Sequence, residues 1–562
     1  MNTSLVLLLV LIWPLLLAGA VAFGATRRLA LRLVPSAALP ALGAAGVLAD
    51  SGLRLPDVML GGALALDDTG RAFLLLSAAA GLATGWLARP RLLAPGASRF
   101  AVLLLLAMEG GFALALADDA LLFFAAGTLG GYALYGLLVD EMSMAAQRAG
   151  RVFVVMLVLS DLVVFELLLI LSQAAGDVDF KSLRQVLVHT DNRELILGLS
   201  ILGFGMKAGI VGVHFWLAPA FVSAMPALRS ALVAFMFGAG LLGWLRLLPF
   251  GEIHWSGAGT LMQWLGWVTL GYAVFAGLLQ ARFRSLLSYA AVCLTGLWLA
   301  MLGSVLQHPQ AWNGVDDAVH AAVPQAGFAM TVLLLLDRGT DRNAAAWRRH
   351  LSRGLMWLAA LLLVATPVGV TGSLAKAGDA AVVGMSSVAA VIAFLVVRGL
   401  LLIDPEVHGA RDPGTSPQTL SAATLSVAAG LTVAAVLAAA DNLIGLVPSE
   451  LGLIILMVSA AAFGAWLSVA RFAHRLPDLP PGDLLVPIGS GLVTALGHAR
   501  RLADTRLRQW RDSVSALVLH LRSAVDWRRI IGRSESALSH WPTAMAVLVL
   551  LGLIAATLST SK

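Results

Sequence analysis

The sequence predicts an all-α polytopic membrane protein, and three observations support this. Of 562 residues, 59% are hydrophobic and only 12% are charged, and the mean hydropathy is +0.87. Ordinary globular domains are about 25% charged. Apolar runs of about 17 to 25 residues, long enough to cross the hydrocarbon core as helices, recur along the whole chain. The basic residues lie mostly in short segments between these runs.

About sixteen of these apolar segments are expected to span the membrane. The first has no basic region before it and no clear cleavage site, so we expect a retained helix rather than a removed signal peptide. The predicted spans lie near 4–23, 29–49, 70–88, 99–117, 119–139, 151–173, 194–213, 225–248, 258–280, 284–306, 317–336, 351–373, 380–402, 420–440, 449–472 and 542–558.

The charges of the connecting loops predict the orientation. Arginines follow odd-numbered spans, as at Arg27, Arg89 and Arg282, whereas acids such as Asp118 and Asp379 follow even-numbered ones. The positive-inside rule then places the odd loops in the cytoplasm and both termini on the outer side of the cytoplasmic membrane. This asymmetry also accounts for the net charge of +6 and the pI of about 10, so no nucleic-acid partner is expected.

The segment from about 483 to 530 is not a span. Its apolar residues, among them Leu507, Trp510 and Leu517, recur at steps of three and four, and arginines occupy much of the rest. This pattern predicts an amphipathic helix that lies along the cytoplasmic surface of the bilayer. A helical hairpin or a calmodulin-binding type of tail is the alternative. The span near 542–558 would then end the chain.

Several kinds of chemistry are excluded by the residue content. Cys293 is the single cysteine, which rules out disulfides, iron–sulfur clusters and cysteine-based zinc sites. The chain has neither a phosphate-binding G-x-x-x-x-G-K-[ST] motif nor a dinucleotide-binding glycine motif between a strand and a helix. We therefore expect no cofactor, no metal site and no catalytic residues of the protein's own.

Ionisable residues within the spans are the informative ones. A charge near the middle of a bilayer costs about 3 kcal/mol on insertion scales, so such residues are functional candidates by default. For Glu109 and Asp161, which lie in mid-span, function is the favoured interpretation. Glu166 could pair with a neighbouring helix, Arg398 could extend to the membrane surface, and His320 could belong to the loop with Asp316. The full set is Glu109, Asp161, Glu166, Lys207, His214, Arg229, His320, Lys376 and Arg398.

Two lysines lie at corresponding places in two halves of the chain. Lys207 is surrounded by glycines in GFGMKAGIVG, and Lys376 ends a run interrupted by Pro367 and two glycines. Lys207 falls in the seventh span and Lys376 in the twelfth, each the fourth member of a five-span block. Two such blocks, 99–248 and 258–402, would be inverted repeats, and interrupted helices at matching positions indicate an ion path. A desolvated lysine can take up and release a proton.

At these residues the sequence resembles a known family. GFGMKAGIVGVHFWLAPAF (203–221) is similar to the G-F-G-x-K-A-G-x-x-P-L-H-x-W-L-P-x-A-H stretch of antiporter-like subunits of hydrogenase-4 and formate hydrogenlyase. These are relatives of complex I chain 5 and of Mrp antiporter subunits. LQARFRSLLSYAAV (279–292) and TPVGVTGSLAK (366–376) resemble two further family stretches. The resemblance implies two inverted half-channels joined by a hydrophilic axis, with N-terminal helices at 1–98, the core at 99–402 and the C-terminal helices at 403–562.

The sequence also departs from the family at titratable positions. The family glutamate that pairs with the seventh-span lysine is replaced by Thr128, and Glu109, one span earlier, is the nearby acid expected to substitute for it. Gly238 and Thr331 stand where the family has titratable residues, which leaves His320 as the nearest titratable group to the latter. Arg284 stands at a family lysine, but an arginine does not readily release a proton. Asp161 matches a family aspartate of the sixth span.

The sequence therefore predicts a proton-translocating, antiporter-like subunit of a multi-subunit membrane complex. Its partners would be other membrane and peripheral subunits, protons or sodium ions, and the bilayer. The expected proton-transfer residues are Lys207, Lys376, Asp161, Glu109, His214 and His320, with support from Arg229, Arg284, Thr128, Thr331 and Arg398. Three alternatives remain open: an Mrp-type cation/proton antiporter, a subunit of an inorganic-carbon-accumulating complex, and a non-conducting structural subunit.

Overall fold

The computed structural model describes residues 3–55, 62–280, 282–336, 346–374, 389–398, 400, 426–433, 435–436 and 459–460. The chain divides into two units, Met1–Asp483 and Leu484–Lys562, and every described residue belongs to the first. Lys376, the predicted amphipathic helix near 483–530 and the predicted last span at 542–558 lie outside the described residues.

Eleven helical segments in the described part are long and apolar enough to cross a membrane, which confirms the polytopic all-α class. Eight of them are formed mainly by single long helices: α1 (Thr3–Ala22), α4 (Asp68–Leu87), α6 (Ser98–Leu116), α7 (Ala120–Val139), α8 (Met144–Ala175), α14 (Ser256–Leu278), α15 (Phe283–Gln307) and α17 (Ala346–Leu374). Two of the others are built from consecutive pieces: α2 (Arg27–Leu33), η1 (Val34–Ala38) and α3 (Leu39–Val47), then α12 (Pro226–Met236), η2 (Phe237–Leu241) and α13 (Leu242–Leu247). The remaining one joins η3 (Pro309–Ala311) to α16 (Trp312–Leu336).

The first twelve predicted spans correspond to helices at nearly the predicted positions. The seventh is shorter than predicted, because α10 (Arg193–Ala208) ends five residues before the expected boundary. The short helices are α5 (Arg89–Leu92), α9 (Phe180–His189) and α11 (Leu217–Ser223).

A β-hairpin between the second and third spans was not predicted. Strand β1 (Ser51–Leu55) pairs antiparallel with β2 (Gly62–Leu66), and Leu64 bridges to Ala117 at the end of α6. The Asp119 carboxylate accepts hydrogen bonds from the backbone N–H groups of Ala63 and Leu122 at 2.8 Å each. These hydrogen bonds connect the hairpin to the loop between α6 and α7.

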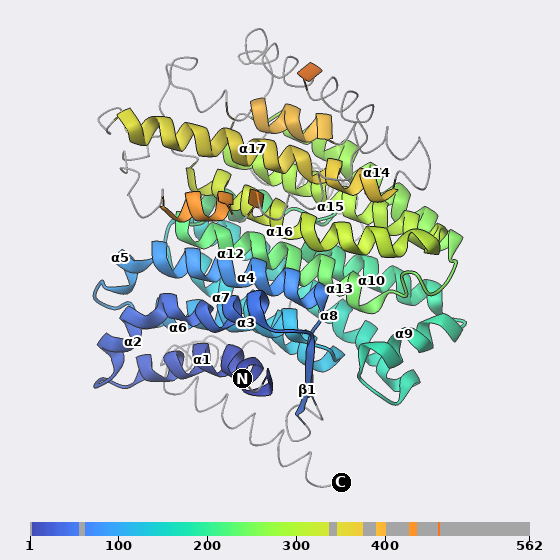
Figure 1. The fold of residues 1–562 in the computed structure, drawn as a ribbon, viewed down its shortest axis with the longest axis horizontal. Coiled ribbons are helices and arrows are strands. Elements are labelled where there is room, and N and C mark those ends of the chain that lie inside the picture. The colour runs from blue at the N-terminus through green and yellow to red at the C-terminus, as the bar shows by residue number, and fades with distance from the viewer. Residues whose placement is uncertain are drawn as a thin grey trace, which may run out of the picture. The chain divides into compact units, whose positions relative to one another are not determined.

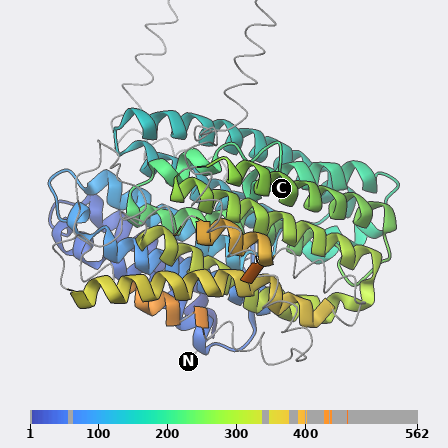
Figure 2. The ribbon, with the colours of Figure 1, turned by 90° about the horizontal axis from the view of Figure 1, so that it is seen from above.

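The long helices pack side by side, many of them nearly antiparallel (Figures 1 and 2). Small residues permit this close packing, as is usual between helices in membranes. A Cβ added at Gly110 of α6 would lie 2.4 Å from the backbone of Gly130 in α7, so that contact requires glycine. Nearly every side chain of α15 is buried, whereas α14 buries only one side, so α15 lies inside the bundle.

Candidate functional site

The seventh span is a broken helix, as its glycines predicted. Helix α10 ends at Ala208, and Gly209 follows with a φ of +81°, a left-handed conformation that favours glycine. The chain then runs without regular helix until α11 begins at Leu217. Because the break removes helical hydrogen bonds within the membrane, its freed polar groups must be satisfied by other protein groups.

Three side chains bind the carbonyls at the end of α10. The Ser160 hydroxyl donates to Gly203 O at 2.8 Å, and the Thr295 hydroxyl donates to Ala208 O at 2.8 Å. The indole N–H of Trp216, from within the connecting segment, donates to Met206 O at 2.8 Å. Residues of α8, of α15 and of the break itself therefore hold the interruption in place.

Lys207, one residue before the end of α10, forms a buried ion pair with Asp161 of α8. Its Nζ lies 2.5 Å from Asp161 Oδ1, and the two residues are 6% and 7% exposed. The ring of Phe235 in α12 lies 6.0 Å from the same Nζ. An ion pair this deeply buried is weak evidence for stability, since removing two charges from water offsets most of their attraction.

Thr128 completes the site from α7. Its hydroxyl donates to Asp161 Oδ2 at 3.4 Å, so the aspartate contacts a hydroxyl with one oxygen and a lysine with the other. The position where the family glutamate was expected thus holds a residue that binds the acid of the next helix. A short lysine–carboxylate hydrogen bond is a geometry along which a proton can shift.

The predicted pairing of Glu109 with Lys207 is wrong. Glu109 lies on α6, which packs mainly against α1, α4 and α7, whereas Asp161 lies on α8, which packs directly against α10. Glu109 is 5% exposed, and its Oε2 has no hydrogen-bond partner among the described residues. The acid that serves the lysine therefore comes from the sixth span rather than the fourth.

His214 lies in the broken segment beyond Lys207. It is buried, and its ring centroid lies 5.0 Å from that of Tyr272 in α14 and 6.2 Å from that of Tyr289 in α15. The imidazole therefore occupies an aromatic environment between the break and the next pair of helices.

Three arginines that were expected to support the site bind helix ends. Arg229 donates to Ala224 O at 3.1 Å and to Leu334 O, near the end of α16, at 2.8 Å. Arg284 donates to Val222 O in α11 at 3.3 Å. Arg398 donates to Leu278 O at the end of α14. A cation at a helix C-terminus compensates the partial negative charge there, which is a structural role.

A second polar cluster lies where α4 and α16 begin. His320 Nε2 lies 2.9 Å from Thr69 Oγ1 and 3.2 Å from Asp316 Oδ1. His320 and Asp316 are one turn apart on helix α16, so the expectation that they could share a loop is wrong. Asp67 was missed by sequence reasoning: it caps α4 and accepts two hydrogen bonds from Arg246, at 2.5 and 2.8 Å. Asp67 stands just before a predicted span, which is the position of a helix N-cap, and this position could have identified it as a capping residue.

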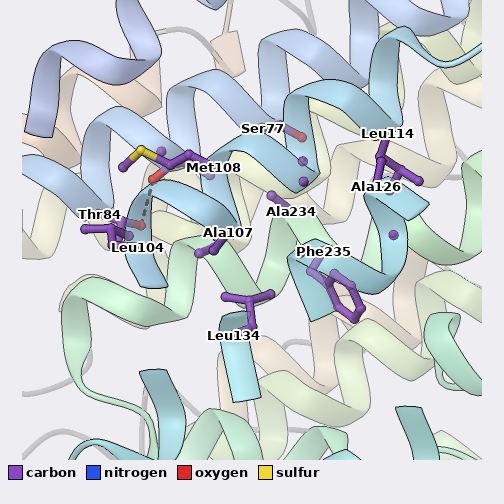
Figure 3. A pocket seen from close by; sticks show the side chains of 18 residues that line it. Ser77, Thr84, Leu104, Ala107, Met108, Leu114, Ala126, Leu134, Ala234 and Phe235 are labelled. Atoms are coloured by element: carbon purple, nitrogen blue, oxygen red, sulfur yellow. Dashed lines mark hydrogen bonds between the residues drawn. The ribbon is translucent and has the colours of Figure 1, made fainter. Parts of the chain in front are cut away.

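Phe235 lines a small cavity between α4, α6, α7, α12 and η2 (Figure 3). Its volume is about 40 Å³, and the hydroxyls of Ser77 and Thr84 are its polar side-chain groups. Gly238, where the family has a titratable residue, lines it within the π-helical turn η2. Thr331 is buried in α16. The cavity and the ion pair thus share Phe235 as a common neighbour.

The many apolar helices, the broken α10 and its buried lysine define a polytopic membrane protein of the antiporter-like class. The chain belongs to the family described as NADH:quinone oxidoreductase/Mrp antiporter, TM, whose sequence model matches residues 117–401, just over half of the chain.

Individual relatives agree with this assignment. The chain is 25% identical over 196 residues to NADH-ubiquinone oxidoreductase chain 5 of Aspergillus niger, a match that covers 34% of this chain and 30% of that protein. It is 27% identical over 279 residues to NADH-quinone oxidoreductase subunit N 1 of Streptomyces griseus subsp. griseus, covering 48% of this chain and 58% of that one. The chain thus spans between about a third and three fifths of these relatives.

Solved structures share the fold over more of the chain. A chain of the Mrp complex from Dietzia sp. DQ12-45-1b superposes with a TM-score of 0.62 at 18% identity, covering 85% of this chain and 98% of that one. A chain of the membrane-bound sulfane sulfur reductase, an archaeal respiratory membrane complex, superposes with a TM-score of 0.56 at 15% identity, covering 83% and 99%. At these identities the likeness establishes the fold.

Proposed function

We propose that the protein conducts protons as an antiporter-like subunit of a multi-subunit, energy-converting membrane complex of the hydrogenase-4 or formate hydrogenlyase type. The observation that carries this proposal is the buried Lys207–Asp161 pair at the broken end of α10. The family match falls within the proposed conducting core, 99–402, and so supports it. The complex lies in the cytoplasmic membrane, with both termini of this chain outside.

The pair can work as a proton switch. While Asp161 stays in contact, its negative charge favours the charged form of Lys207. If the carboxylate withdraws, the lysine is left desolvated in an apolar site, which favours release of its proton. His214, which follows in the broken segment and whose ring lies beside tyrosines of α14 and α15, is the proposed acceptor. Lys376 would repeat this role in the second half of the core.

One observation favours the alternative of a non-conducting structural subunit. Gly238 and Thr331 supply no titratable group in the eighth and eleventh spans. Water can substitute for such groups only where it has room and polar partners, and about 10–15 Å³ is needed for each molecule. The cavity beside Gly238 has that room, but its lining is mostly apolar, and of its two hydroxyls that of Thr84 is already hydrogen-bonded to Ala80 O and Ser230 Oγ.

Proton uptake by vesicles that contain the reconstituted complex decides between these functions. An imposed membrane potential should drive uptake in the wild-type complex, and Lys207→Ala should abolish the uptake per assembled complex, with the yield of complex determined for the same preparation. Lys181→Ala, a substitution of the exposed lysine on α9, is the matched control and should conduct normally. Equal uptake by wild type and Lys207→Ala would instead support the structural role.

A further inference from the structure

The outward face of α8 carries a carboxylate within an apolar stripe. The stripe consists of side chains that recur at steps of three and four and are between 38% and 62% exposed: Val155, Leu159, Leu162, Phe165 and Leu169. Residues at this spacing lie on one face of a helix. Glu166 lies on the same face and is exposed.

Glu166 also lies within the apolar length of α8, which is long enough to cross the bilayer. It follows Asp161 by five residues, which places it roughly 7 Å further along α8 and about 140° around the helix. Asp161 points inward to Lys207, so Glu166 points outward. Helix α8 continues for more than two turns beyond it, to Ala175. A carboxylate at this depth faces hydrocarbon unless protein covers it, and ionisable groups that face lipid there are strongly disfavoured.

The described part of this chain does not supply that cover. No hydrogen bond or ion pair joins Glu166 to any described residue. Helix α14 offers the contrast, because its exposed stripe has no charged residue anywhere between Ser256 and Leu278. The members of that stripe are between 52% and 66% exposed: Leu261, Trp264, Val268 and Phe275. The uncharged α14 stripe can therefore face lipid, whereas the carboxylate in the α8 stripe makes contact with lipid unfavourable.

We propose that a transmembrane helix of another subunit packs against the α8 stripe, and that a lysine or arginine of that helix pairs with Glu166. A helix is the element that satisfies its own backbone at this depth. A basic side chain is the group that compensates a carboxylate there, and apolar residues above and below it match Leu162 and Leu169. The solved structures with this fold come from an Mrp complex and a respiratory membrane complex, so partner subunits are expected.

Spin labels on the two stripes test the proposal. Cys293 is the single cysteine and is fully buried, so Cys293→Ala provides a background for labelling at Leu162→Cys or, as the matched control, Val268→Cys. Each variant is purified as the complete complex in nanodiscs of native lipid, and the accessibility of the label to oxygen is measured. We expect the Leu162 label to be immobilised and several-fold less accessible than the Val268 label. Equal accessibility would overturn the proposal.

Two further samples identify what covers the stripe. With Glu166→Leu added, we expect the accessibility of the Leu162 label to rise to that of Val268, because the partner helix has lost its charge contact; no change would show that the carboxylate does not recognise the partner. When this chain is reconstituted alone in the same lipids, the Leu162 label should also become accessible. If it stays shielded there, the cover comes from this chain or a second copy of it, which contradicts a partner subunit.

Discussion

Lys207 Nζ lies 2.5 Å from Asp161 Oδ1, so the lysine of the broken helix α10 is paired with an acid from α8. Both groups are buried, and the hydroxyl of Thr128 contacts the other carboxylate oxygen. The pair therefore has one interaction that can move a proton and one that orients the acid. Its consequences can be measured separately as stability and as conduction.

Removing the acid alone should be costly. Asp161→Asn leaves the Lys207 charge buried without its counter-charge, and breaking a buried pair from one side costs about 3–5 kcal/mol. We expect a lower melting temperature of the purified protein and a large loss of proton uptake.

The double variant Asp161→Leu with Lys207→Met is the control for this prediction. It replaces both charges by apolar groups, so it should recover most of the stability but none of the uptake. A double variant that is no more stable than Asp161→Asn would show that the pair does not account for the loss.

Gly240 permits the close approach of η2 to the end of α10. A Cβ added there would lie 2.5 Å from Ala208 Cβ and 2.6 Å from its backbone nitrogen. Gly240→Ala should therefore push α10 away and cost about 1–3 kcal/mol of stability, measured by thermal unfolding. Gly198→Ala, on α10 with open space around the added methyl group, is the matched control and should be neutral or slightly stabilising. Equal effects of the two substitutions would refute this packing role.

The Asp67–Arg246 contact predicts a pH dependence of stability. Burial opposes ionisation of Asp67, but the Arg246 charge and its hydrogen bonds outweigh it, so the pKa of Asp67 lies below its ordinary value. A depressed folded-state pKa contributes stability above the unfolded value of about 3.9, and this contribution disappears as the pH falls through the folded value. Asp67→Asn keeps a side-chain oxygen at the N-cap of α4 but loses the charge. The wild type should therefore lose more thermal stability than the variant between about pH 6 and about pH 3, and parallel curves would count against the contact.

The apolar lengths and glycines of the sequence predicted the first twelve spans and the break after Lys207, because span length and backbone freedom are local properties. The partner of Lys207 was not predictable in the same way. Asp161 and Glu166 lie five residues apart on one helix, yet one faces the bundle and the other faces outward. Lipid tails are as apolar as a protein core, so hydrophobicity does not distinguish these two faces. The hairpin Ser51–Leu66 was overlooked because its short apolar alternation lies between two much stronger spans.

If Lys207 conducts by releasing its proton, Lys207→Arg should separate the charge of this residue from its ability to give up a proton. Arginine keeps the positive charge beside Asp161 but does not give up a proton near neutral pH. The measurement is proton uptake by vesicles of the reconstituted complex, with the yield of assembled complex determined for the same preparation. We expect an assembled complex that has lost proton uptake. Uptake at the wild-type rate by Lys207→Arg would contradict this expectation.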